Sequence, residues 1–127
     1  MTSLDHISLS TADYDKSLAF YLAALAPLGI TSLMSFGDAG RRTAGRGVEF
    51  PYLWIAEGGA LTGGRLHLAF RADSRGLVDA FHAAAMAAGG TDNGAPGLRA
   101  QYHPTYYGAF VLDPDGHNIE AVCHAPE

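Results

Sequence analysis

Cysteine, basic residues and long hydrophobic runs are all scarce in this sequence, and each scarcity excludes a class of protein. Cys123 is the single cysteine among 127 residues, so no intrachain disulfide can form. No run of about 18 apolar residues is present, which predicts that no helix spans a membrane. The first residues carry no basic segment followed by an apolar run, so no secretory signal is predicted. We therefore expect a cytoplasmic protein without a membrane partner.

The shortage of positive charge argues against nucleic acid as a partner. Eight Lys and Arg face thirteen Asp and Glu, which gives a formal net charge of −5. Arg41, Arg42 and Arg46 gather in a Gly-rich segment, but three charges there are more typical of a solvated loop. Hydrophobic residues make up 48% and charged residues 17%, which fits a globular chain. The length predicts a single domain over residues 1–127.

The chain also contains an internal repeat. With a shift of 61 positions, Leu4–Gly29 aligns with Arg65–Gly90 without a gap, and seven of the 26 pairs are identical. Four of the seven are alanines, but the repeat also pairs His6 with His67. The alignment predicts a duplicated unit, with module one at about 1–58 and module two at about 64–127.

Both halves show the same order of elements, a strand, a helix and three further strands. Asp13 or Thr11 can cap the first helix, and Asp73 or Ser74 the second. Glycines are expected to end both helices, and the sequence Asp113-Pro114-Asp115-Gly116 predicts a tight turn. The apolar stripe of the first helix is predicted at Leu18, Tyr21, Leu22 and Leu25. The strands are expected at 4–10, 31–36, 46–50 and 52–56, and then at 65–71, 91–93, 106–112 and 118–124.

Strand alternation places one metal-capable side chain on each of three strands, facing away from the helices. Leu66, Leu68 and Phe70 form an apolar face that must pack on a helix, so His67 points the other way. The same reasoning applies to His6 and Glu120. Two imidazoles and one carboxylate suit divalent iron, and are compatible with manganese, zinc, nickel or cobalt. Taken singly, each histidine is more typical of a hydrogen-bonded structural residue, and Glu120 of a solvated one, but the duplication relates the two histidines and favours a shared role.

These residues resemble one protein superfamily over nearly the whole chain. The family is the vicinal oxygen chelate superfamily of glyoxalases, bleomycin resistance proteins and extradiol dioxygenases, and the segments 94–99, 102–107 and 120–124 look like an uncharacterised bacterial subgroup of it. The likeness rests on Asp5-His6, on Leu66-His67-Leu68-Ala69-Phe70, and on the stretch from Leu112 to Glu120.

The resemblance implies an α+β fold in which two βαβββ modules form an incomplete barrel around a cavity. It implies a metal held by the first and fourth strands of each module, here His6, His67 and Glu120. The fourth position, within 52–55, carries an apolar or aromatic residue, and Glu49 could replace it only in another strand register. Three ligands match the dioxygenase pattern, whereas glyoxalase-type sites use four. The loss of a ligand is also how metal-free binding members arise.

A bound metal would chelate adjacent oxygens of a small substrate and stabilise an enolate or oxyanion, as in a lyase, an isomerase or a dioxygenase. We expect a catalytic role for Glu120, with His103 and Tyr107 as candidates for proton transfer. Aromatic walls suit a planar or apolar ligand. The candidate substrate-binding residues are Tyr52, Trp54, Tyr102, Tyr106 and His124.

Two other functions remain open at this point. One is a metal-independent protein of the bleomycin-resistance kind, which sequesters a small aromatic or cationic compound and needs no cofactor. The other is a regulatory or structural domain with a vestigial site. The resemblance further implies a homodimer, in which His6 could meet His67 and Glu120 of the partner subunit.

Overall fold

The structure is a computed structural model that describes residues 4–63 and 66–127. Gly64 in the predicted linker and Arg65 at the predicted start of a strand lie outside the described residues. The first module consists of β1 (Ile7–Ser10), α1 (Tyr14–Leu25), the short 3-10 helix η1 (Ala26–Leu28), β2 (Thr31–Phe36), β3 (Thr43–Gly47) and β4 (Pro51–Ala56). The second consists of β5 (His67–Arg71), α2 (Arg75–Ala87), β6 (Thr91–Leu98), β7 (Tyr107–Leu112) and β8 (Asn118–Cys123).

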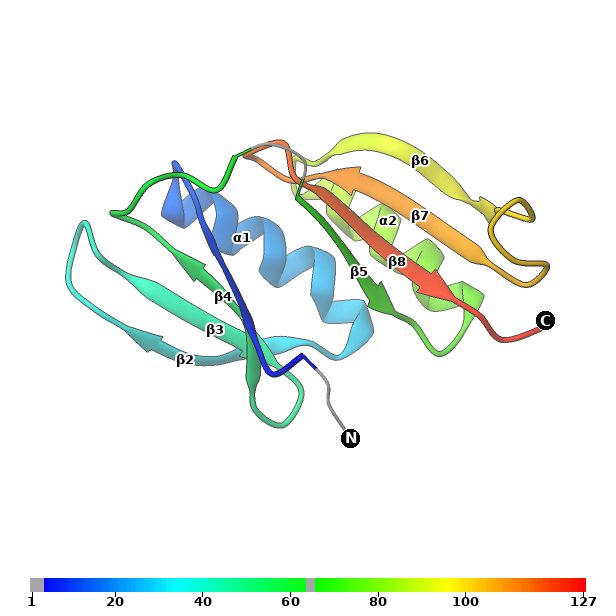
Figure 1. Cartoon of the computed structure of the whole chain (residues 1–127), viewed down its shortest axis with the longest axis horizontal. Helices are drawn as coiled ribbons and strands as arrows, with labels where there is room; N and C mark the ends of the chain where they lie inside the picture. The colour runs from blue at the N-terminus through cyan, green and yellow to red at the C-terminus, as the bar shows by residue number, and fades with distance from the viewer. Residues whose placement is uncertain (1–3, 64–65) are drawn as a thin grey trace.

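Each module forms its own four-stranded mixed sheet, and the two sheets have the same topology (Figure 1). The strand orders are β1-β4-β3-β2 and β5-β8-β7-β6. In both sheets the first strand runs parallel to the last, and the remaining neighbours are antiparallel. The prediction of an α+β fold with two βαβββ modules is confirmed. Neither described helix is long and apolar enough to cross a membrane.

Side-chain capping explains where the two helices begin. The Asp13 carboxylate accepts from the backbone N–H of Lys16 at 3.1 Å, and the Ser74 hydroxyl from that of Leu77 at 3.2 Å. Both side chains satisfy a donor that the first helical turn would otherwise leave unpaired. Of the predicted apolar stripe of α1, Tyr21 and Leu25 are fully buried, but Leu22 is 52% exposed. Phe20 and Ala24 are buried instead, because α1 packs against both its own sheet and α2.

The main core lies between the helices and one face of each sheet. On β4, Leu53 and Ile55 point to this side and are fully buried, whereas Tyr52 and Trp54, which alternate with them, are only half-buried. The same alternation on β5 turns Leu68 and Phe70 inward. The opposite face of each sheet, called here the open face, carries no helix. Most of the site residues predicted from the sequence lie on these open faces.

Two strands differ clearly from their predicted positions. β3 covers 43–47 rather than 46–50, because residues 48–50 form the turn into β4. At Gly45, an added Cβ would lie 2.8 Å from the Trp54 ring and 2.7 Å from Pro51, so a side chain at this position would clash with β4. β6 covers 91–98 rather than 91–93, and two register shifts against β7 allow the glycines and Pro96 within it.

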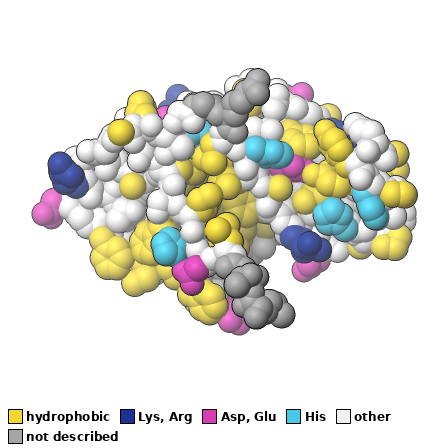
Figure 2. Space-filling view, viewed as in Figure 1, with side chains coloured by type: hydrophobic (Ala, Val, Ile, Leu, Met, Phe, Trp, Pro, Cys, Tyr) yellow, Lys and Arg dark blue, Asp and Glu magenta, His cyan; other side chains and the backbone are white. Residues whose placement is uncertain are grey.

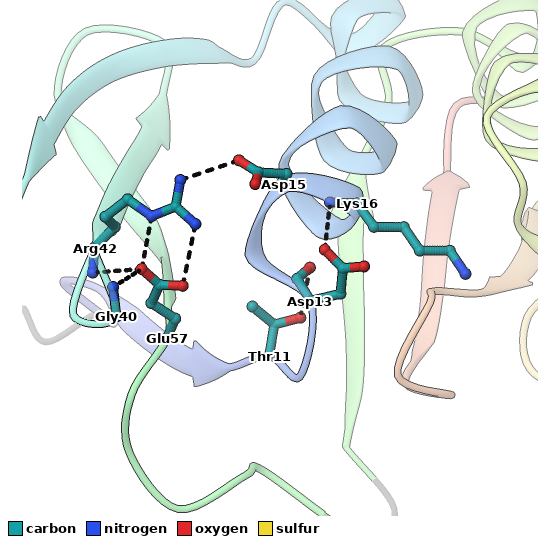
Figure 3. A network of polar contacts seen from close by, with 7 residues as sticks. All are labelled: Thr11, Asp13, Asp15, Lys16, Gly40, Arg42 and Glu57. Atoms are coloured by element: carbon teal, nitrogen blue, oxygen red, sulfur yellow. Dashed lines mark hydrogen bonds and ion pairs between the residues drawn. The ribbon is translucent and has the colours of Figure 1, made fainter. Parts of the chain in front are cut away.

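A polar network fixes the loop between β2 and β3 (Figure 3). The Glu57 carboxylate accepts from the backbone N–H groups of Gly40 and Arg42, both at 3.0 Å, and from the Arg42 guanidinium. Arg42 also donates to Asp15 in the first turn of α1 at 3.2 Å. The loop is thereby tied to both the end of β4 and the start of α1.

Candidate functional site

A buried carboxylate lies at the centre of the open face of the second sheet. Glu120 on β8 is 1% exposed, and its neighbours across the sheet are Ala69 on β5 and Phe110 on β7. Its Oε1 lies 2.8 Å from Nε2 of His67, and its Oε2 accepts a hydrogen bond from the Tyr106 hydroxyl. The structure thus brings together two of the three predicted metal ligands. A carboxylate this deeply buried requires such partners.

The Tyr106 hydroxyl stays protonated beside the Glu120 carboxylate. Burial and the hydrogen bond to the Glu120 carboxylate raise the pKa of the Tyr106 hydroxyl above its usual 10. The hydroxyl is therefore a permanent donor at neutral pH. Gly108 makes room for the pair, since a Cβ there would lie 3.1 Å from both Glu120 Oε2 and the Tyr106 ring.

The Glu120 carboxylate faces a pocket of about 390 Å³. Its lining consists of His67, Tyr102, Tyr106, Phe110 and Glu120. The His67 and Phe110 rings lie 6.1 Å apart, and the Tyr102 and Tyr106 rings 5.1 Å apart. Polar groups at one end and aromatic rings around them suit a small planar ligand that carries oxygen atoms.

Two histidines flank this pocket at the end of the sheet. The His124 ring lies 5.2 Å from the Tyr106 ring and 6.0 Å from the His103 ring. Thr105 donates to Nδ1 of His103 through its backbone N–H at 3.2 Å, so the neutral ring carries its hydrogen on Nε2. Of the predicted catalytic and substrate-binding residues, Tyr102, His103, Tyr106 and His124 therefore gather near Glu120.

Tyr107 lies apart from this group. It faces the helix side of β7, where its hydroxyl donates to Asp79 of α2 at 2.7 Å and its ring lies under the guanidinium of Arg75. The hydrogen bond to the Asp79 carboxylate raises the pKa of Tyr107. The opposite orientations of Tyr106 and Tyr107 follow from strand alternation.

His6 also lies away from His67 and Glu120. Its Nδ1 is 2.5 Å from Asp5 Oδ1, and it lines a pocket of about 440 Å³ on the open face of the first sheet with Ser8, Thr43 and Trp54. Figure 1 shows the start of β1 and the start of β5 at opposite ends of the seam between the sheets. One chain therefore carries two candidate half-sites, one with His6 just before β1 and the other with His67 at the start of β5.

The pairing register identifies the counterpart of Glu120 in the first module. Ala69 pairs with Glu120 in the second sheet, and Ser8, its equivalent in the repeat, pairs with Trp54 in the first. Trp54 therefore occupies the position of the fourth ligand. The Trp54 ring is stacked on the Phe36 ring, with 5.9 Å between their centres. Tyr52 lies on the same face of β4, and burial raises the pKa of its hydroxyl. Glu49 lies before β4 and is exposed.

A second group with ligand-type side chains was missed in the sequence. Asp113, Asp115 and His117 place ligand atoms within 4.8 Å of one another, so they could hold a metal ion. Asp115 already accepts from the Thr11 hydroxyl at 2.6 Å and the Ala12 N–H at 3.1 Å, and Asp113 accepts from Tyr21. An ion would have to take the place of these donors. The spacing Asp-x-Asp-x-His is the sequence signal for this group, and it overlaps the residues that predict a tight turn.

That turn links the two modules. It lies between β7 and β8, while all three donors belong to α1 or the residues just before it. The turn itself forms as predicted, since the Gly116 N–H donates to the Asp113 carbonyl at 2.9 Å and Gly116 has a φ of 88°. The two carboxylates therefore act as a clamp between the halves.

Large apolar side chains are exposed beside both half-sites. Figure 2 shows hydrophobic side chains over the strands of both sheets and along the seam between them. The residues more than half exposed are Leu4, Phe36, Val48, Phe50, Leu61, Leu98 and Tyr102, in addition to Leu22 on α1. A pocket of about 280 Å³ at the seam is lined by His6 just before β1 and by residues of β1, β4 and β5, among them Tyr52 and Ala69. Such a surface is typical of an interaction site.

Comparison with known proteins agrees with this architecture. The chain is similar to a glyoxalase/bleomycin resistance protein from Albidiferax ferrireducens T118, with 31% identity over 96% of this chain and 98% of that one, and a TM-score of 0.77. A glyoxalase/bleomycin resistance protein/dioxygenase family enzyme from Burkholderia phytofirmans PsJN is 20% identical over 98% and 100% of the two chains, with a TM-score of 0.75. A hypothetical protein from S. aureus is 20% identical over 97% of each chain, with a TM-score of 0.70.

A comparison with individual curated proteins found no match to the chain. A comparison with protein families found a match that covers almost the whole sequence. The sequence profile described as Glyoxalase/Bleomycin resistance protein/Dioxygenase superfamily matches residues 3–121. This range includes both half-sites and the clamp between the modules. The chain therefore belongs to the glyoxalase/bleomycin resistance protein/dioxygenase superfamily.

Proposed function

We propose that this protein is a metal-dependent enzyme that acts on a small, oxygen-rich substrate at the open face of the second sheet. The observation that carries the proposal is the Glu120 carboxylate, which is 1% exposed, lies 2.8 Å from the His67 imidazole and lines a pocket. A carboxylate that only stabilised the fold would not need to face a pocket.

The donor set fits a divalent metal ion. A carboxylate and an imidazole are ligands for iron, manganese, zinc, nickel and cobalt alike. Their atoms point to the same place from adjacent strands, and the Tyr106 hydroxyl fixes the second carboxylate oxygen. Such an outer hydrogen bond orients a ligating carboxylate.

We propose that a second copy of the chain supplies the third ligand. Within one chain, His6 belongs to the other half-site, and a homodimer that faces the first sheet of one copy towards the second sheet of the other would join the halves. The exposed Phe50 and Tyr102 side chains beside the two half-sites support such an interface, because it would remove them from water.

The residues around the ion would then divide the work between binding and proton transfer. A metal held by Glu120 and His67 would supply Lewis-acid chemistry towards neighbouring substrate oxygens. Tyr102 and Phe110 would hold the apolar part of the substrate against the sheet. His103 or His124 would take up or deliver a proton at the edge of the pocket, since imidazole titrates near neutral pH.

A metal-free binding protein is the second candidate, and one observation favours it. Trp54, stacked on Phe36, stands where a fourth ligand would be, so the first sheet offers an aromatic surface rather than a carboxylate. Such a surface suits the sequestration of a planar compound.

Metal titration distinguishes the two candidates. We expect purified protein to bind Zn²⁺ or Co²⁺ at about one ion per chain, and H67A and E120Q to weaken binding by more than about 100-fold, since the outer partners of a metal ligand alone are typically worth 10–100-fold. H82A is the matched histidine control, because His82 pairs with Asp92 away from the pocket. D115N tests the Asp113, Asp115 and His117 group. No tight binding by the wild type, or loss of binding only in D115N, would contradict the proposal.

A further inference from the structure

An arginine with no acidic partner lies on the open face of the second sheet. The Arg99 guanidinium lies 5.4 Å from the centre of the Phe110 ring, and Phe110 lines the pocket of Glu120. Among residues 4–63 and 66–127, no carboxylate lies within ion-pair distance of Arg99. The chain has a net charge of −5, so acidic residues that could pair with an arginine are in excess, yet none of the described ones pairs with Arg99.

Backbone carbonyls of β6 hold the Arg99 side chain in one place. Nη1 donates to the Gly97 carbonyl and Nη2 to the Ala95 carbonyl, both at 2.8 Å. Two glycines provide the space, because a Cβ at Gly94 would lie 3.2 Å from Nη2 and one at Gly97 would lie 3.1 Å from Nη1. These contacts orient the guanidinium before any ligand binds, so a bound anion would not have to order it.

The strand order sets the spacing between the two ends of the pocket. Across the open face come His67 on β5, Glu120 on β8, Phe110 on β7, and then β6, whose Gly94 lies opposite Phe110. Neighbouring strands are about 4.8 Å apart, so β8 and β6 are separated by about 10 Å. A ligand with oxygens near Glu120 and a flat body over Phe110 would extend towards Arg99.

We infer that Arg99 binds an anionic group of the substrate and so selects small acids over neutral or cationic compounds. The inference rests on the function proposed above for the position of the substrate, and it specifies the substrate class: a planar compound with adjacent oxygens at one end and a carboxylate at the other. Guanidinium groups pair with carboxylates through charge-assisted hydrogen bonds. A carboxylate placed beside Arg99 also stays about two strand spacings from the Glu120 carboxylate, which limits repulsion.

A matched pair of probes tests the inference. 3,4-Dihydroxybenzoate and catechol share the adjacent oxygens and the ring, and differ only in the carboxylate. By calorimetry with Zn²⁺-loaded protein, the wild type is expected to bind the acid about 10- to 100-fold more tightly than R99Q does, with catechol unchanged. R99K should be intermediate because it keeps the charge but loses the planar fork. R75Q is the control, since Arg75 lies over Tyr107 on the helix side.

Three results would overturn the inference: equal binding of the acid by the wild type and R99Q, an equal loss for both probes, or binding of neither probe by the wild type. Thermal unfolding of R99Q shows whether the variant is still folded. Repeating the titrations without Zn²⁺ separates this inference from the metal proposal. A preference for the acid that depends on Arg99 but not on Zn²⁺ would keep the inference and count against the metal.

Discussion

At the residue scale, Glu57 shows how a single side chain makes stability depend on pH. Its hydrogen bonds from the Arg42 guanidinium and the backbone N–H groups of Arg42 and Gly40 lower the pKa of its carboxyl from 4.5 to about 2. A lowered pKa in the folded state means that Glu57 stabilises the fold above pH 4.5, and that this contribution disappears as the pH falls towards 2.

The variant E57Q should reveal this contribution. We expect it to be less stable than the wild type at pH 7, and the difference to shrink steadily as the pH is lowered from about 4.5 towards 2. Urea unfolding at several pH values measures it. E49Q is the control, because Glu49 is exposed and forms no hydrogen bond within the described chain. A difference between E57Q and the wild type that stays constant with pH would contradict the role given to Glu57.

Alternation along single strands made some site residues predictable and left others hidden. Glu120 and His67 were placed on one face from the sequence because Ile119 and Leu68 beside them are plainly apolar. The sequence around Arg99 shows no such alternation. The position of its side chain depends on register shifts in β6 and on hydrogen bonds to the carbonyls of Ala95 and Gly97. Such local geometry leaves no periodic trace in the sequence.

At the scale of elements, two glycines of the second module illustrate opposite demands of packing. Gly90, just before β6, would place a Cβ 2.4 Å from Val111 and 2.8 Å from Phe20. Gly76 lies in the first turn of α2, where the nearest atom to an added Cβ would be the Ser74 hydroxyl at 3.8 Å.

The same substitution should therefore have opposite effects at these positions. G90A is expected to destabilise the protein by about 1–3 kcal/mol through overpacking between α1 and the second sheet. G76A is expected to stabilise it by about 0.5–1 kcal/mol, because alanine restricts the unfolded chain and favours a helix. Chemical denaturation of both variants checks this. Similar changes in both would mean that backbone freedom, not space, decides the outcome at Gly90.

Element boundaries were predicted well where turns or caps have a chemical marker. Asp13, Ser74 and the turn at Gly116 all do what their side chains or backbone favour. The Gly-rich segment 37–47 has neither such markers nor an alternating pattern. The predicted range of β3, 46–50, therefore starts three residues later than the observed strand. Its pairing partners in β2 and β4 determine where it lies, and these contacts are remote in the sequence.

At the scale of the whole molecule, the Asp115 clamp joins the modules. Its carboxylate accepts from the Thr11 and Ser17 hydroxyls at 2.6 and 3.3 Å and from the Ala12 N–H, all in the first module. We propose that the chain unfolds as one domain because of this clamp and the contact between α1 and α2.

Removal of the clamp should lower the stability of both modules together. D115A is expected to cost about 1–3 kcal/mol, since it leaves donors at Thr11 and Ala12 without their partner. Fluorescence of Trp54, which reports the first module, and far-UV circular dichroism should shift to lower denaturant in parallel. Asp79→Ala serves as a comparison within the second module, because it removes only the bond from Tyr107. Two separate transitions in D115A would contradict a single folding unit.

The relative placement of the half-sites could not be read from the sequence. Duplication pairs His6 with His67, but it does not say whether the two histidines meet within a chain, across a dimer or not at all. In the folded chain, the helices and the clamp place the two open faces so that His6 lines one pocket and His67 another. A site that joins His6 to His67 and Glu120 would therefore be a property of the proposed dimer.

Mixed dimers test the proposed metal site between two chains most directly. H6A and E120Q chains, each expected to lose tight Zn²⁺ binding alone, are unfolded together, refolded and separated by an affinity tag on one of them. In a mixed dimer, His6 of the E120Q chain would meet the intact His67 and Glu120 of the H6A chain. We predict about one tightly bound Zn²⁺ per mixed dimer, because one complete site is restored and the other carries both defects. Mixed dimers that bind Zn²⁺ no better than either parent would contradict a site shared between two chains.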